Sequence, residues 1–127
     1  MKIFEKEVSY ENPIVSKSYN FALWIVKFYK YYTDKNRTLE AIFKQLLRSG
    51  TSIGANVSES QSAFTKKDFI HKMGISLKEA RETEYWLKLL NESNTIKKNE
   101  YKSLYNYCEE ISKLLTTIIK SAKQKLK

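Results

Sequence analysis

The side chains that most often carry out chemistry in proteins are scarce in this sequence. It contains one histidine, His71, and one cysteine, Cys108. A lone histidine, with no Cys, His or carboxylate cluster at ligand spacing, does not make a His-rich metal site, so we expect no metal. His71 is expected on a helix surface. Cys108 falls at core spacing, which predicts a small buried hydrophobic residue rather than a nucleophile.

Other catalytic patterns also fail to match. Glu79 and Glu82 lie one helical turn apart, but a di-iron bundle needs Glu-x-x-His on two helices, which the sequence lacks. The stretch from Gly50 to Gly54 has neither the lysine nor the spacing of a phosphate-binding loop. A HEPN-type ribonuclease needs an arginine four to six residues before its histidine, whereas residues 65–67 are Thr, Lys and Lys. We therefore predict a protein that is not an enzyme and uses no cofactor.

Charge gives the clearest indication of a partner. The 127 residues carry 23 basic and 14 acidic side chains, for a net charge of +9. This surplus favours anionic partners, RNA or DNA above all, although charge that only maintains solubility remains an alternative. The surplus is largest in residues 97–127. The lysines that we expect to contact nucleic acid are Lys66, Lys67, Lys72, Lys97, Lys98, Lys102, Lys113, Lys120 and Lys123.

The positions of these side chains depend on helices. Only three Gly and one Pro interrupt the chain, which favours a few long helices over many short strands. Asn12 and Pro13 suit the start of a first helix that runs to about Tyr32. The next two helices are expected to begin at the possible caps Thr38 and Thr65, and the last runs from about Lys97 to the end. This pattern predicts an all-α, up-down-up-down antiparallel four-helix bundle, with residues 1–127 as one domain and residues 1–12 as an N-terminal arm.

Two features of the first two helices predict close contacts. Gly50 and Gly54 interrupt the apolar face of the second helix, where their use is the close approach of another helix. On the first helix, Trp24 and Tyr31 extend apolar character beyond one buried stripe. We therefore expect a second contact surface there, as a homo-oligomer would need.

The second helix also carries a polar stripe beside its apolar one. A hairpin turning near residues 63–64 places residue i opposite about residue 127 − i, which sets Gln45 against Glu82 and Arg48 against Glu79. The same rule brings Lys72 near Glu59. One interpretation is a polar seam that fixes the register of the two helices, and the other is a ligand or partner site. The seam residues are Gln45, Arg48, Ser49, Ser52, Asn56, Glu59, Glu79 and Glu82.

The sequence gives no sign of export or membrane insertion. The N-terminus lacks the apolar core of a signal peptide, and no stretch approaches the roughly 18 apolar residues of a membrane span. A single cysteine allows no internal disulfide. We expect a cytoplasmic protein.

Three runs in the middle of the chain resemble a known family. They are Gln45 to Glu59 (QLLRSGTSIGANVSE), Asp68 to Ile70 (DFI) and Ser76 to Leu87 (SLKEARETEYWL). In combination they resemble the small bacterial four-helix bundle proteins first known from reading frames inside intervening sequences of large-subunit ribosomal RNA genes. They are also similar to the accessory variability protein of diversity-generating retroelements.

The resemblance implies an antiparallel bundle that assembles as a ring-like homopentamer. In the retroelement branch it also implies a basic surface that engages RNA or DNA and a reverse transcriptase. No enzymatic activity is established for the family. We therefore expect an oligomeric accessory protein that binds nucleic acid. A protein–protein assembly module with no nucleic-acid role is the alternative.

Overall fold

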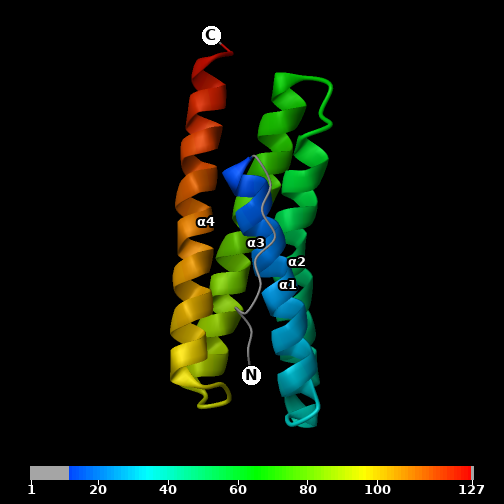
Figure 1. Cartoon of the computed structure of the whole chain (residues 1–127), viewed down its shortest axis with the longest axis vertical. Helices are drawn as coiled ribbons and strands as arrows, with labels where there is room; N and C mark the ends of the chain where they lie inside the picture. Colours follow the sequence, from blue (N-terminus) through cyan, green and yellow to red (C-terminus); the bar gives the residue numbers. More distant parts are fainter. Residues whose placement is uncertain (1–11, 127) are drawn as a thin grey trace.

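The computed structural model describes residues 12–126, which form four long helices that alternate in direction (Figure 1). These helices are α1 (Pro13–Thr33), α2 (Glu40–Ser60), α3 (Lys66–Glu92) and α4 (Lys98–Gln124), with a short 3₁₀ turn, η1 (Arg37–Leu39), before α2. Within the described range there are helices and no strands. The prediction of an all-α four-helix bundle is confirmed. Of the expected arm, only Asn12 belongs to the described residues.

The helix starts show which local signals operate. The Asn12 side chain accepts a hydrogen bond from the Ile14 amide, and the Thr65 side chain accepts one from the Asp68 amide, so both predicted caps are present. The predicted cap at Thr38 is wrong. Thr38 lies inside η1, and Leu39 occupies the cap position of α2 without a side-chain hydrogen bond.

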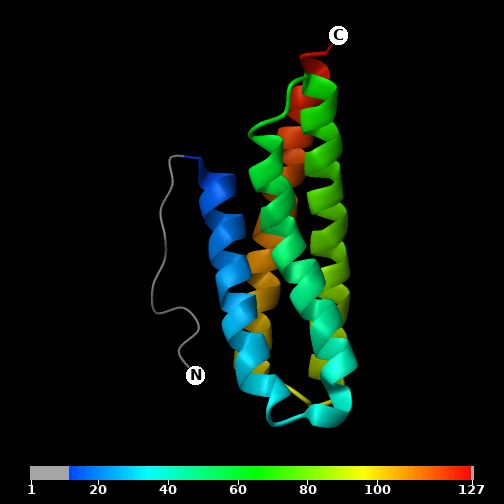
Figure 2. The same cartoon turned by 90° about the vertical axis from the view of Figure 1, so that its right-hand side faces the viewer.

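Each helix buries one face in a common core, and neighbours in sequence are neighbours in space (Figure 2). The two glycines of α2 allow α1 to approach closely, as predicted. A Cβ added at Gly50 would lie 3.0 Å from the Ile25 side chain, and one at Gly54 would lie 3.0 Å from the Ser18 carbonyl oxygen. The second contact is with backbone, which cannot rotate away.

The expectation for Trp24 is wrong. Its side chain is 1% exposed and packs edge-on against Tyr107 of α4, with 4.6 Å between the ring centroids. Tyr31 is half-buried, and the Lys35 ammonium lies 4.9 Å from its ring centroid. Trp24 therefore belongs to the core because α4 covers it. The large apolar side chains that α1 leaves exposed are Tyr19 and Val26.

A buried polar contact joins the end of α1 to the start of α4. The Tyr32 hydroxyl donates a hydrogen bond to Glu100 and accepts one, 3.1 Å long, from the Lys97 amide. Burial, followed by the bond to Glu100, raises the pKa of Tyr32 to about 12. A side chain of α1 thus satisfies a backbone donor ahead of the first turn of α4.

Candidate nucleic-acid interface

Five of the predicted lysines form one stripe along α4. Successive members are 4, 11, 7 and 3 residues apart, and these spacings return to the same helix face. All five side chains are exposed, and the stripe spans about 38 Å at 1.5 Å per residue. Within this stripe the one carboxylate is the half-buried Glu109. The five are Lys98, Lys102, Lys113, Lys120 and Lys123.

The other predicted lysines are divided by the fold. Lys97, just before α4, is exposed, as are Lys66 and Lys67 in the first turn of α3. Lys72 is half-buried, and its ammonium lies 3.2 Å from Glu59 of α2. Lys72 therefore belongs to the contact between α2 and α3 and is removed from the exposed basic surface.

Three cations that we did not predict extend this surface onto α3. Lys78, Arg81 and Lys88 are exposed, and no residue among 12–126 forms an ion pair with them. Arg81 lines a hollow of about 420 Å³ between α3 and α4, together with Lys113 of the α4 stripe and the carboxylates Glu84 and Glu109. The cations of α3 and α4 therefore share one face of the bundle. Composition alone does not reveal these three cations, because residues 62–96 carry six basic and five acidic side chains and are nearly neutral.

The predicted pair in the polar seam is formed. One guanidinium nitrogen of Arg48 lies 2.7 Å from Glu79, and the other contacts Glu82. Trp86 donates a 3.0 Å hydrogen bond to the same Glu82 oxygen. The hydrogen bond from Trp86, assisted by those from Arg48, lowers the pKa of the Glu82 carboxyl despite its partial burial. Gln45 accepts a bond from Arg48 and does not reach Glu82 as expected.

The remaining seam residues bond within the bundle. The Asn56 side chain donates to the Ser52 carbonyl oxygen in α2, and Thr83 of α3 donates to the buried Ser49 hydroxyl at 2.9 Å. Ser76 of α3 donates to the carbonyl oxygen of Ile53 in α2. Because these groups satisfy one another, the seam has the character of a register-fixing contact between α2 and α3.

The two reactive residue types lie as expected. His71 is exposed on α3. Cys108 is fully buried, its thiol lies 3.4 Å from the Ala80 carbonyl oxygen, and burial raises the pKa of that thiol. A buried thiol with a raised pKa is a poor nucleophile. Across residues 12–126, no group of three or more His, Cys, Asp or Glu side chains is placed to hold a metal ion.

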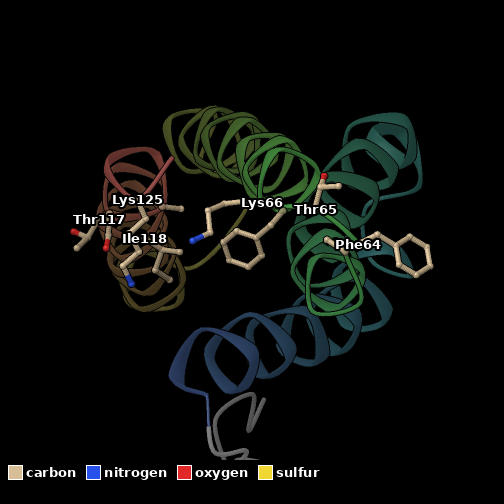
Figure 3. A pocket seen from close by; sticks show the side chains of 10 residues that line it. Phe64, Thr65, Lys66, Thr117, Ile118 and Lys125 are labelled. Carbon is tan, nitrogen blue, oxygen red and sulfur yellow. The ribbon is translucent and has the colours of Figure 1, made fainter. Parts of the chain in front are cut away.

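An open apolar groove of about 630 Å³ lies at one end of the bundle, between the α2–α3 turn, the start of α3 and the last turns of α4. Phe69, Ile118 and Ala122 line it, with lysines at its rim. Lys66 points toward α4, whereas the ring of Phe64, a lining residue that is fully exposed, points away from α4 (Figure 3). Sequence reasoning placed a turn here but did not foresee an exposed phenylalanine on it.

Within the described residues, none of the helices is both long and apolar enough to cross a membrane. Basic side chains therefore lie on the outside of a helical bundle whose apolar faces point mostly inward. A basic surface of this kind is suited to binding anions.

Comparison with known proteins agrees with the fold. A crystal structure of a protein of unknown function from the S23 ribosomal protein family of Bacteroides thetaiotaomicron is 48% identical, with a TM-score of 0.81. The match covers 84% of this chain and 98% of that one. No curated protein matches. The family model for the 23S rRNA-intervening sequence protein matches residues 10–117, most of the chain, and so the chain belongs to the 23S rRNA-intervening sequence protein family.

Proposed function

We propose that this chain is a non-enzymatic accessory protein that binds RNA or DNA through the basic face of α3 and α4. The observation that carries the proposal is the stripe of five exposed lysines along α4, with Arg81 and Lys113 lining one hollow. A stripe about 38 Å long is long enough to lie along several successive phosphates of a nucleic-acid backbone. Membership of a family named for a ribosomal RNA insert adds support for RNA.

Lysine ammonium groups recognise phosphate as point charges and carry little information about base sequence. Each contact displaces a counterion from the nucleic acid, so affinity falls as the salt concentration rises. The proposed binding is therefore weakly sequence-selective and strongly dependent on salt.

Self-association is part of the proposal. A ring of identical subunits multiplies a modest basic patch, because each further contact is made at high effective concentration. The family resemblance supports five subunits, and the exposed Tyr19, Val26 and Phe64 offer apolar surface for contacts. Where a retroelement accompanies the gene, a reverse transcriptase is the protein partner that the resemblance supports.

Salt-dependent binding tests the proposal. The purified full-length chain is titrated with short RNA and DNA at several salt concentrations, and its mass is measured in the same buffers. We expect micromolar or tighter binding at low salt, a steep loss of affinity with added salt, and a mass near five subunits. Affinity that is indifferent to salt contradicts phosphate recognition by these lysines.

A second candidate function rests on the groove at the end of the bundle. The groove is lined mainly by apolar side chains, and the fully exposed Phe64 stands on the adjoining turn. Such a surface suits a protein–protein assembly module, in which the charge of +9 serves solubility. The measurement that favours this candidate is an intact oligomer that binds neither RNA nor DNA at low salt, with assembly lost on Phe64→Ser.

A further inference from the structure

One exposed face of α3 carries a regular series of residues. From Lys67 to Glu92 the series advances in alternating steps of four and three residues, which keeps every member on the same side of the helix. Every member except the half-buried Gly74 is exposed. We call this series the α3 stripe; it consists of Lys67, His71, Gly74, Lys78, Arg81, Tyr85, Lys88 and Glu92.

The fold makes this stripe cationic although α3 as a whole is nearly neutral. Glu79 and Glu82 turn toward α2, where both are bound by Arg48. Glu84 turns toward α4, where it accepts a 3.0 Å hydrogen bond from Ser112. Four basic residues remain on the stripe and one carboxylate, Glu92, stands at its end. The cations of the stripe, from Lys67 to Lys88, extend over about 32 Å and form an electrostatic site for an anionic partner.

Tyr85 is the aromatic member of the stripe. It is 60% exposed, and its ring is held by a T-shaped contact with Trp86 at 5.0 Å between centroids. Arg81 precedes it by one turn and Lys88 follows it by one turn. An exposed, braced aromatic ring between cations is the arrangement on which nucleic-acid bases stack while their phosphates are neutralised.

Gly74 supplies an independent observation. A Cβ added there would meet nothing within 4 Å, in contrast to Gly50 and Gly54, which α1 packs against. Glycine in a helix interior lowers stability relative to alanine, and no contact among residues 12–126 accounts for it at Gly74. Its place on the cationic stripe indicates that the close approach it permits is by a partner.

We propose that the α3 stripe binds single-stranded nucleic acid, with one base stacked on Tyr85, phosphates on Lys78, Arg81 and Lys88, and the strand passing close to the helix at Gly74. The inference rests on the proposed function and names the substrate class. Stacking on Tyr85 needs an unpaired base, so a single strand binds better than a duplex. A second copy of this face is a poor partner, because cations would meet cations.

The first test separates stacking from charge. Binding of an unstructured single-stranded RNA and of a duplex with the same sequence is measured for Tyr85→Ala and Tyr85→Phe. Tyr85→Ala weakens single-strand binding about tenfold, and Tyr85→Phe, which keeps the ring, stays near wild type.

The second test combines an expected gain in stability with an expected loss of nucleic-acid affinity. Gly74→Ala and Gly74→Leu both favour the helix, and Gly74→Ala raises Tm by about 4 °C. Both are expected to weaken single-strand binding, Leu more than Ala, because each places a side chain where the strand approaches. A merely structural role for Gly74 predicts no change in affinity.

The outcomes distinguish the inference from the function on which it rests. Salt-dependent binding by the wild type that is unchanged in Tyr85→Ala and Gly74→Leu overturns the inference and leaves the proposed function standing. Equal affinity for single strand and duplex also overturns it. Absence of wild-type binding to any nucleic acid at low salt overturns both. A change of oligomer mass in the Tyr85 or Gly74 variants, with nucleic-acid affinity unchanged, assigns the stripe to a contact between subunits instead.

Discussion

Two sides of α3 use charge in opposite ways. On the side facing α2, Arg48 binds Glu79 and Glu82, and Trp86 donates to the same Glu82 oxygen, so opposite charges are satisfied inside the protein. On the outward side, Lys78, Arg81 and Lys88 are exposed, and the described part of the chain forms no ion pair with them. The same helix thus carries carboxylates paired with α2 on one side and exposed cations on its outward side.

The difference separates stability from binding. Side chains bonded across the seam contribute to the packing of α2 on α3, so removing them should change the free energy of unfolding. Exposed cations that repel one another contribute little to folding, so removing them should change affinity instead.

The largest effect is expected on nucleic-acid binding from the α4 stripe. Replacing its five lysines by Gln removes five phosphate contacts, which lowers the slope of log affinity against log salt by about 3.5 for a single strand. Affinity at low salt falls by about a hundredfold or more. The free energy of unfolding changes by about 0.5 kcal/mol or less per site, because the side chains are exposed.

An equal loss of charge elsewhere is the control for this variant. If the control loses as much affinity as the variant without the five α4 lysines, net charge and not the α3–α4 face governs binding. The control replaces five cations on the α1–α2 side, namely Lys27, Lys30, Lys35, Arg37 and Lys44.

The next effect contrasts two glycines. Gly54→Ala forces a Cβ to within 3.0 Å of the Ser18 carbonyl oxygen, and we expect a loss of about 2 kcal/mol in the free energy of unfolding. Gly74→Ala meets open space and gains about 1 kcal/mol. Urea unfolding at one fixed protein concentration measures both. Stabilisation by Gly54→Ala contradicts the close approach of α1 to α2.

Two arginines give a smaller contrast. Arg48→Met leaves Glu79, whose side chain is only 13% exposed, without its cation and lowers the free energy of unfolding by about 1.5 kcal/mol. Arg81→Met, on the outward face, changes it by about 0.5 kcal/mol or less and weakens nucleic-acid binding. Unfolding and binding are measured for both variants. A loss of affinity in Arg48→Met together with a loss of stability in Arg81→Met contradicts the roles assigned to the two arginines.

The smallest effect concerns Tyr32 and pH. Tyr32→Phe removes the hydroxyl that bonds Glu100 and the Lys97 amide, and costs about 1 kcal/mol at neutral pH. The pKa of Tyr32 is higher in the folded chain, about 12, than its ordinary value of 10.0, so the folded state holds this proton more tightly. The stabilisation from this shift is complete below about pH 10 and is lost as the pH rises to about 12.

Unfolding curves of wild type and Tyr32→Phe across this pH range test the prediction. Subtracting the two removes the titration of the lysines, which both proteins share. The difference between them should shrink as the pH rises from 10 to 12, and a constant difference contradicts the pKa shift.

Local sequence was sufficient for much of the fold. Asn12 and Thr65 were recognised as caps because a short polar side chain satisfies nearby backbone amides whatever the rest of the chain does. Apolar residues at steps of three and four defined the buried face of α2. The predicted cap at Thr38 was wrong because Thr38 is part of the 3₁₀ turn that follows Asn36.

The candidate site depended more on neighbours distant in sequence. Spacing alone placed the five α4 lysines on one face, because a single helix fixes their relative positions. Lys72 was expected both to contact nucleic acid and to lie near Glu59, and its ion pair with Glu59 of α2 places it in the seam. Trp24 was assigned to an outer contact, yet α4 covers it.

The sequence by itself determined the helices, the caps at Asn12 and Thr65, and the lysine stripe, since each depends on residues within a few turns of one another. The sequence also predicted the Arg48–Glu79 pair, but only the tertiary structure decided which carboxylates of α3 are turned inward. Arg48 reaches two carboxylates of α3, and Ser112 of α4 reaches a third. By composition α3 is nearly neutral, but packing on two sides turns three of its five carboxylates away from the outward face and leaves Lys78, Arg81 and Lys88 there.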